Sequence, residues 1–364
     1  MTTTARRAVF SGLALASSVA ILAGCASAPE GDGDAAGGSG SSDFVPCMVS
    51  DAGGFDDKSF NQLGYEGLTE AAESLGATPQ TVESADETVY NSNIDSLVAN
   101  GCNLIVTVGF LLADATGVAA EANPDVDFAT IDDSSNDADN VRPITFNTSE
   151  AAFLAGYVAA SYSTTGTVGT MGGLQIPTVT IFMDGFQDGV EYYNEQKDAD
   201  VQVAGGWDVA AQSGGTFTGG FEAGTQAKAS AQTLIDQDAD VIMAVGGPIY
   251  QSAAEAIRDS GKDIAMIGVD SDTYETDSAN ADLFLTSVLK GIKQATNDVV
   301  TSAADGDFTN EPYVGTLEND GVGIAPFHDF ESKVDSSLQG ELDDIKAGII
   351  DGSIEVESPS APKS

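Results

Sequence analysis

Short apolar runs alternate with amphipathic stretches along most of this chain. The first run, Val45–Ser50, predicts a buried strand. It is followed by Ser59–Leu75, where apolar residues recur at helical spacing and predict a helix. A second helix is expected after Asp86, which can cap it, and further strands are expected at Asn103–Val108 and Asp127–Ile131. This order of strands and helices predicts a parallel sheet.

The same pattern appears a second time further along the chain. The segment LVANGCNLIVTVG at 97–109 aligns with LIDQDADVIMAVG at 234–246, and 127–131 aligns with 263–267 at nearly the same offset. We therefore predict an α/β fold of two lobes, each a doubly wound, mostly parallel sheet. The second lobe is expected to contain helices at 150–162 and around 186–193, and strands at 167–171, 201–203, 241–245 and 264–269.

The C-terminal quarter of the chain is expected to pass between the lobes. We assign the strand Leu283–Val288 and a helix at about Gly291–Ala304 to the first lobe, and a final helix at about Leu338–Ile349 to the second. Three crossings follow, near 148, 282 and 313–324. The predicted first lobe is 44–148 plus about 283–312, and the predicted second lobe is 149–282 plus about 325–355.

The N-terminus has the pattern of an export signal. Arg6 and Arg7 precede the apolar run Ala8–Ala23, which ends in the tetrapeptide Leu-Ala-Gly-Cys at Cys25. The tetrapeptide resembles a prokaryotic lipobox, which predicts a signal peptide at 1–24, lipidation of Cys25 and a flexible tether at 25–43. We therefore expect a protein anchored to the outer face of the cell membrane. General secretion and twin-arginine export stay open, as does a bacterial or archaeal source.

The strongly acidic charge of the chain excludes some classes of binding partner. The 364 residues include 13 lysines and arginines against 57 aspartates and glutamates. Such a surface repels nucleic acids and anionic headgroups, so no nucleic-acid partner is expected. Hydrophobic residues make up 42% of the chain, enough for two substantial cores. We expect a monomer without a metal or cofactor.

Two cysteines remain after the predicted signal peptide and lipidation site. Cys47 and Cys102 each lie at or just before a predicted strand. Outside the cytoplasm they can pair, since the first and third strands of a doubly wound sheet can be neighbours. Two separate buried thiols are an equal alternative.

The segment DAGGFDDKSFNQ at 51–62 places several recognition groups directly after the first predicted strand. Ligands of open α/β sheets bind at the carboxyl ends of the strands, so this loop is expected to face a ligand. Ser59 is predicted to cap the following helix, and Asp56 and Asp57 to favour its N-terminus electrostatically. Phe60, in the first turn, is interpreted as a site residue rather than a core residue.

A series of motifs extends this prediction along the chain. The 51–61 segment, the G-F-x-x-G at 185–189, the Gly-Gly turn at 246–247, IGVDSD at 267–272 and TSVLK at 286–290 follow the lipobox in one order. Together they resemble the basic membrane protein (BMP) family of lipoproteins over roughly residues 44–350. The resemblance implies a type I periplasmic-binding-protein-like fold that holds a purine nucleoside between two lobes. Delivery to the permease subunits of an ABC importer is implied as well.

The resemblance also implies roles for individual residues. The base is held between two aromatic rings, of which Phe60 is one by motif position. Phe221 fits the second position better than Trp207, but both stay open because 208–219 has the character of an insertion. The other implied contacts are Asp51 and Asn61 on the first-lobe wall, Asp132 at the base edge, and Gly246, Asp270 and Lys290 at the ribose.

The same residues bear on two other classes of function, a hydrolase and a sugar receptor. Asp51, Asp56 and Asp57 distantly resemble the calcium site of nucleoside hydrolases, but glycine stands at 53 where a further acid is needed. The chain also lacks the common hydrolase motifs, so no enzyme is expected. A receptor for a sugar or an autoinducer-like polyol is the alternative, because it too would use stacking aromatic rings.

Overall fold

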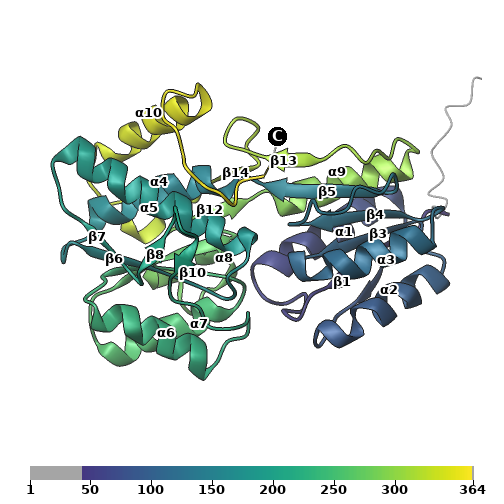
Figure 1. Ribbon diagram of the computed structural model, residues 1–364, viewed down its shortest axis with the longest axis horizontal. Coiled ribbons are helices and arrows are strands. Elements are labelled where there is room, and N and C mark those ends of the chain that lie inside the picture. Colours follow the sequence, from purple (N-terminus) through teal and green to yellow (C-terminus); the bar gives the residue numbers. More distant parts are fainter. Residues whose placement is uncertain (1–42, 363–364) are drawn as a thin grey trace, which may run out of the picture. The chain divides into compact units, whose positions relative to one another are not determined.

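The computed structural model describes residues 43–362, which belong to one compact unit, Gly40–Ser364. The predicted signal peptide, Cys25 and all of the predicted tether except residue 43 lie outside the described residues. Two six-stranded sheets dominate the described chain, each flanked by helices (Figure 1). The expected α/β fold with mostly parallel sheets is confirmed. We call each sheet with the helices packed on it a lobe.

The first lobe is built on a sheet of the order β13-β5-β4-β3-β1-β2, in which all neighbouring strands are parallel. Two of its inner strands, 46–50 and 104–108, are completely buried, as is typical of parallel strands that are covered on both faces. The strands are β1 (Pro46–Ser50), β2 (Gln80–Val82), β3 (Leu104–Val108), β4 (Asp127–Ile131), β5 (Val141–Phe146) and β13 (Tyr313–Gly315), and the helices are α1 (Phe60–Leu75), α2 (Tyr90–Ala99), α3 (Ala113–Ala122) and α9 (Ile292–Ala304).

The second lobe repeats this plan with the order β14-β12-β11-β10-β6-β7, where only β14 is antiparallel to its neighbour. A small hairpin of β8 (Trp207–Asp208) and β9 (Ser213–Gly214) begins one residue before the predicted insertion and ends inside it. The strands are β6 (Thr167–Gly172), β7 (Gln202–Ala204), β10 (Val241–Val245), β11 (Ala265–Asp270), β12 (Phe284–Lys290) and β14 (Val322–Ile324), and the helices are α4 (Thr148–Tyr162), α5 (Pro177–Lys197), α6 (Thr225–Asp236), α7 (Ile249–Ser260), α8 (Thr273–Thr276) and α10 (Leu338–Ile350).

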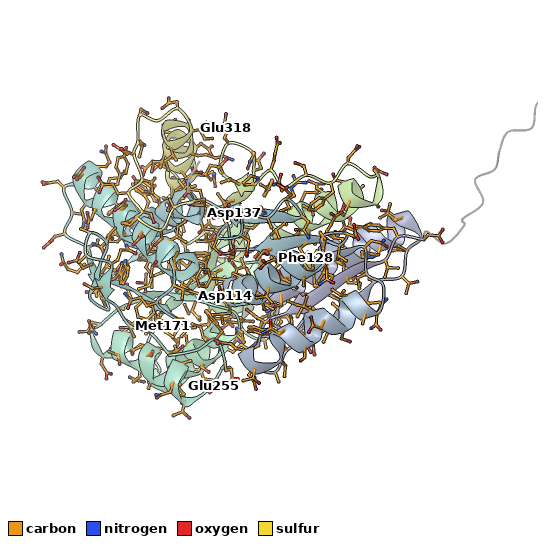
Figure 2. All side chains as sticks on the ribbon, turned by 45° about the vertical axis from the view of Figure 1, so that its right-hand side comes forward. Asp114, Phe128, Asp137, Met171, Glu255 and Glu318 are labelled. Atoms are coloured by element: carbon orange, nitrogen blue, oxygen red, sulfur yellow. A yellow bond between two sulfur atoms is a disulfide. The ribbon has the colours of Figure 1, made fainter. Side chains whose placement is uncertain are left out.

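Each lobe has one buried cluster of its own, and a third cluster continues through both lobes. Phe128 on β4 and Met171 on β6 mark the two clusters that belong to a single lobe, whereas Glu255 and Glu318 lie on the outside (Figure 2). In the second lobe α4 and α5 pack unusually closely, because a Cβ on Gly185 or Gly189 would overlap a backbone carbonyl oxygen of α4. The G-F-x-x-G motif is therefore explained by helix packing.

One assignment from the sequence is wrong. The strand predicted at Leu283–Val288 was placed in the first lobe, but β12 pairs in parallel with β11 of the second sheet. The apolar pattern identified a strand without identifying its neighbour. The chain crosses only after Lys290, and α9 then packs against α1 of the first lobe. The middle crossing is thus at about 290–292 rather than near 282.

The two cysteines of the first lobe form a disulfide. Cys47 lies on β1 and Cys102 lies just before β3, and these two strands are paired in the sheet. The structure thereby favours the bridge over two separate thiols. Because the bond closes a loop of 55 residues, it restricts the unfolded chain and stabilises the first lobe.

The segment after α10 is held against the second lobe. Ser358 Oγ donates to the Asp184 carboxylate at 2.6 Å, and Ser360 Oγ lies 2.7 Å from Thr180 Oγ1, so both contacts fix the segment to α5. Its last described residues, Pro359–Pro362, line a cavity to which Asp132 and Lys290 also contribute. The C-terminal segment (Figure 1, yellow) therefore reaches the region between the lobes.

Candidate functional site

A cavity of about 60 Å³ lies between the two lobes, where the carboxyl ends of both sheets meet. Its position agrees with the general rule for ligand sites of open α/β sheets. The structure brings together in its lining all eight residues predicted to bind ligand: Asp51, Phe60, Asn61, Asp132, Phe221, Gly246, Asp270 and Lys290.

Aromatic rings from both lobes line the cavity. Phe60 comes from the first turn of α1, and Phe221 comes from the loop before α6. Trp207 does not line it. Its indole Nε1 donates to Asp184 at 2.8 Å, and its ring packs edge-on against Phe217 with centroids 5.9 Å apart. The structure therefore places Phe221 in the cavity and Trp207 in the interior of the second lobe.

Glycines make room for the Phe221 ring. A Cβ on either Gly173 or Gly246 would overlap this ring, and Gly246 also has a φ of +129° that other residues rarely adopt. Gly246 was predicted at the ribose, and in the structure it additionally allows the ring to approach the end of β10. Substituting it would displace the ring as well as change the turn.

The first-lobe loop is organised by Asp57. Its carboxylate accepts from the backbone N–H groups of Ser59, Asn61 and Gln62 at 2.9–3.1 Å, so it caps the N-terminus of α1. Ser59 occupies the N-cap position, as predicted, but its side chain makes no capping bond. The carboxylate, being charged, forms stronger bonds to the free N–H groups than a hydroxyl would.

Asn61 is oriented by two carboxylates. Its Nδ2 donates to Asp51 Oδ1 at 2.8 Å and to Asp57 Oδ2 at 3.1 Å, which fixes the direction of the amide. Its Oδ1 is buried and has no hydrogen-bond partner within residues 43–362. Because Asn61 lines the cavity, this oxygen is an acceptor available to a donor group of a ligand.

Lys290 occupies the centre of the polar side of the cavity. Its Nζ lies 2.5 Å from Asp132 Oδ2 of the first lobe and 3.7 Å from Asp270 Oδ1 of the second. It also lies 4.9 Å from the centroid of the Phe60 ring. The side chain is only 3% exposed, so the carboxylates compensate for a charge that would otherwise be costly to bury.

The two aspartates beside Lys290 share an unusual backbone conformation. Asp132 follows β4 and Asp270 ends β11, and each has a φ of +67°, in the left-handed region. Non-glycine residues adopt this region uncommonly, with Asp and Asn among the more frequent exceptions. The strand ends thus turn both carboxylates toward Lys290.

Burial dominates the titration of these acids. Desolvation raises the pKa of Asp51 to about 6 and that of Asp270 to about 6. It also raises the pKa of Asp132, although the Lys290 ammonium opposes this shift. With Asp57, the cavity is lined by four carboxyl groups and one lysine among the described residues. The site is therefore rich in acceptors and unfavourable for a phosphate.

Several lining residues were missed by the sequence reasoning. Phe110 and Leu111 follow β3, and Phe182 on α5 is both buried and part of the lining. The position of Phe110 just after a buried strand was the available signal, since the β1 loop had been selected on that basis. The α5 residues carried no comparable signal.

Further features of the described chain concern metal clusters, the single histidine and membrane-spanning helices. Across residues 43–362, no group of three or more His, Cys, Asp or Glu side chains could hold a metal ion. His328 is paired with Asp272 at 2.8 Å and stacks on Tyr274, away from the cavity lining. None of the helices in this part of the chain is long and apolar enough to cross a membrane.

Comparisons with known proteins agree with this arrangement. Residues 44–359 match the family described as ABC transporter substrate-binding protein PnrA-like. The chain is 31% identical to the ABC transporter nucleoside-binding protein BmpA of Lactococcus lactis, over 96% of this chain and 97% of that protein. It is also 31% identical to the CD4+ T-cell-stimulating antigen of Listeria monocytogenes, over 87% and 88%. An ABC transporter solute-binding protein from Aeropyrum pernix shares the fold, with a TM-score of 0.75 at 24% identity, over 87% and 94% of the two chains.

Proposed function

Because this chain belongs to the Bmp family of PnrA-like ABC transporter substrate-binding proteins, we propose that it captures a nucleoside, preferably a purine nucleoside, and delivers it to an ABC importer. The resemblance predicted from the motifs is confirmed by this membership. The family consists of substrate-binding proteins, so the protein is not an enzyme, as expected. The name of the Lactococcus relative supports a nucleoside as the ligand.

The observation that carries the proposal is the pairing of ring faces with acceptors in one cavity. Phe60 and Phe221 come from opposite lobes, which suits a flat base inserted between them. Stacking of this kind contributes about 0.5–1.5 kcal/mol beyond burial. The free Oδ1 of Asn61 suits an N–H or O–H donor, and such donors are plentiful on a nucleoside.

The polar residues of the cavity are assigned roles from their positions in the motifs. We assign Asp51 and Asn61 to the first-lobe wall and Asp132 to the base edge. Gly246, Asp270 and Lys290 are assigned to the ribose, where carboxylates would accept charge-assisted hydrogen bonds from hydroxyl groups. A nucleotide would add a phosphate to a site with four carboxyl groups and a single lysine, so a neutral nucleoside is the better fit.

The setting of the protein is part of the proposal. Its family suggests an extracytoplasmic, membrane-associated substrate-binding protein. We assign the attachment to lipidation of Cys25, with the protein acting as a monomer beside the permease subunits. The Cys47–Cys102 disulfide supports this location, because such bonds persist in oxidising compartments.

A thermal-shift screen tests the ligand class on a protein lacking residues 1–25. Inosine, guanosine, adenosine, uridine, ribose and inosine monophosphate are added separately. At one hundred times its dissociation constant, a ligand should add about 2.7 kcal/mol of stability. We expect shifts with purine nucleosides and little or none with the nucleotide or ribose.

The variant Phe60→Ala should strongly reduce the nucleoside shift, because it removes one of the two rings. Phe55→Ala is the matched control: Phe55 lies in the same loop and packs on Tyr65 with centroids 5.0 Å apart, but it does not line the cavity. Its nucleoside shift should be retained. A shift with sugars or polyols alone would refute the nucleoside proposal.

A further inference from the structure

The loop before α1 reaches across to the second lobe through a residue that does not line the cavity. The backbone carbonyl of Lys58 accepts hydrogen bonds from Ser271 Oγ and Thr276 Oγ1, each at 2.9 Å. Both donors lie in the segment between the end of β11 and the end of α8. A first-lobe carbonyl is therefore held by two hydroxyl groups of the second lobe.

The side chain of Lys58 makes a further contact between the lobes. Its Nζ lies 3.0 Å from Asp277 Oδ1. Asp277 is buried and also accepts from Tyr250 Oη at 3.1 Å and from Asn280 Nδ2 at 2.9 Å. Because both of these partners belong to the second lobe, the carboxylate is held in place by its own lobe and offers a fixed acceptor to Lys58.

Ser59 connects these contacts to the cavity. Its hydroxyl lies 3.0 Å from the carbonyl oxygen of Val269 and 3.2 Å from Asp270 Oδ2, and its proton can bond to either. Asp270 lines the cavity, whereas Ser59 does not. The same loop that caps α1 and forms the first-lobe wall is thus joined to the second-lobe wall.

The backbone of Lys58 is shaped for this contact. Its φ of +61° is in the left-handed region, which is unfavourable for a residue with a Cβ. Such conformations persist where surrounding contacts compensate for them. Here the compensating bonds to the Lys58 carbonyl come from the second lobe. The unfavourable backbone conformation of Lys58 is therefore compensated only while the lobes are in contact.

We propose that Lys58 and Ser59 form a closure latch with Ser271, Thr276 and Asp277, which holds the lobes together without touching the ligand. The latch adds stability to the closed form alone. It therefore raises the closed population and slows ligand release, while the cavity residues determine which ligand binds. Only the choice of nucleoside as probe rests on the proposed function.

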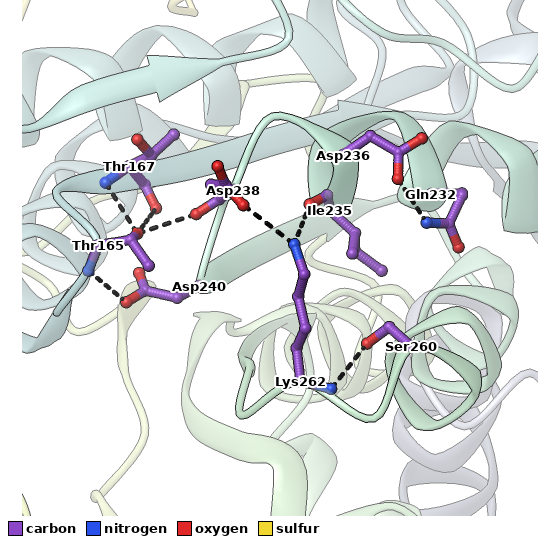
Figure 3. Close-up of polar contacts among 9 residues, drawn as sticks. All are labelled: Thr165, Thr167, Gln232, Ile235, Asp236, Asp238, Asp240, Ser260 and Lys262. Carbon is purple, nitrogen blue, oxygen red and sulfur yellow. Dashed lines mark hydrogen bonds and ion pairs between the residues drawn. The ribbon is translucent and has the colours of Figure 1, made fainter.

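The first test compares Lys58→Gln with Lys262→Gln. Lys262 is a half-exposed lysine that also makes an ion pair, 3.1 Å from Asp238, but this pair has an exposed carboxylate and lies entirely within the second lobe (Figure 3). The side chains of Lys58 and Lys262 are 41% and 47% exposed. Lys58→Gln should speed inosine dissociation roughly three- to tenfold with the same order of preference among nucleosides, and Lys262→Gln should leave it unchanged.

A second measurement does not require a ligand. In the protein lacking residues 1–25, and thus Cys25, spin labels at Asp114→Cys on α3 and Glu255→Cys on α7, both exposed and labelled in Figure 2, report the separation of the lobes. Lys58→Gln should shift the distance distribution toward larger separations than Lys262→Gln. Thr276→Val, which removes one hydroxyl donor to the Lys58 carbonyl, should shift it in the same direction.

The two readouts separate failure of the latch from failure of the nucleoside proposal. If the parent protein binds no nucleoside, the proposed function fails, and the label distances alone decide the latch. If Lys58→Gln and Thr276→Val match Lys262→Gln in label distances and in any measurable dissociation rate, the latch is refuted. A changed order of nucleoside preference would also refute it, because the latch residues would then act on the ligand itself.

Discussion

The two walls of the cavity are built in different ways. About half of the first-lobe wall is one continuous segment, 51–61, in which Asn61 donates to both Asp51 and Asp57. The second-lobe wall gathers Phe221, Gly246, Asp270 and Lys290 from four separate places along the chain. The first wall is organised locally, whereas the second depends on the sheet and on close packing at glycines. Changes to the second wall should therefore affect both stability and binding.

The largest effect on stability and binding is expected from removing the Lys290 ammonium, which contacts carboxylates of both walls. Lys290→Met would leave the buried carboxylates of Asp132 and Asp270 without their cation. Breaking a buried pair in this way typically costs 3–5 kcal/mol, so we expect about that loss in the free energy of unfolding in urea, together with loss of nucleoside binding.

Lys293→Met is the matched control for Lys290→Met. Lys293 is a neighbour in sequence, but its pair with Glu70, at 3.0 Å, is on the surface, and the expected loss is below about 1 kcal/mol. Equal losses in the two variants would contradict the view that Lys290 links the walls.

Asp51 should make the stability of the first wall depend on pH. Burial raises its folded-state pKa from 3.8 to about 6, so between these values the folded protein holds a proton that the unfolded chain has lost. Its contribution is complete below about 3.8 and is lost as the pH rises through about 6, to a total on the order of 3 kcal/mol.

Asp51→Asn should remove this part of the dependence. Urea unfolding of both proteins from pH 4 to pH 7 measures it, with Asp86→Asn as control, since Asp86 is an exposed cap of a different helix. If the difference in unfolding free energy between the parent and Asp51→Asn does not vary with pH, the raised pKa is contradicted.

The second ring offers a smaller and more selective test. Phe221→Ala should weaken nucleoside binding by about 2 kcal/mol, roughly thirtyfold, because a stacking face is lost. Trp207→Phe should lower stability through loss of the bond to Asp184, while the order of nucleoside affinities is kept. Isothermal titration calorimetry of both variants measures this. Weaker binding in Trp207→Phe than in Phe221→Ala would indicate that Trp207, rather than Phe221, is the second ring of the site.

The difference between the two walls also determines which of their residues could be predicted from the sequence. The strands and the 51–62 loop were predictable, because the apolar runs, the glycines and the acids are local signals. The residues of the second wall could be placed only through the order of motifs resembling a known family. Local sequence patterns alone do not specify which strand ends lie next to each other in the folded protein.

The errors have the same cause. The β12 strand was recognised but assigned to the wrong lobe, since an apolar run does not specify its hydrogen-bonding neighbour. Ser59 was assigned to the helix cap because its type and position fit, but Asp57 makes the capping bonds and Ser59 bonds across the lobes instead. A competing partner distant in sequence decided both outcomes.

The C-terminal segment has a practical consequence for measurement. Ala361 lines a cavity shared with Asp132 and Lys290, yet it lies outside the lining of the ligand cavity. A solvent-sensitive fluorophore attached through Ala361→Cys would be close to the moving surfaces without occupying the ligand's place. In the protein lacking residues 1–25, and thus Cys25, the two native cysteines Cys47 and Cys102 are bonded to each other, so the dye would react at the engineered thiol. Ligand capture would then be read as an optical signal, and the protein would serve as a reagentless sensor.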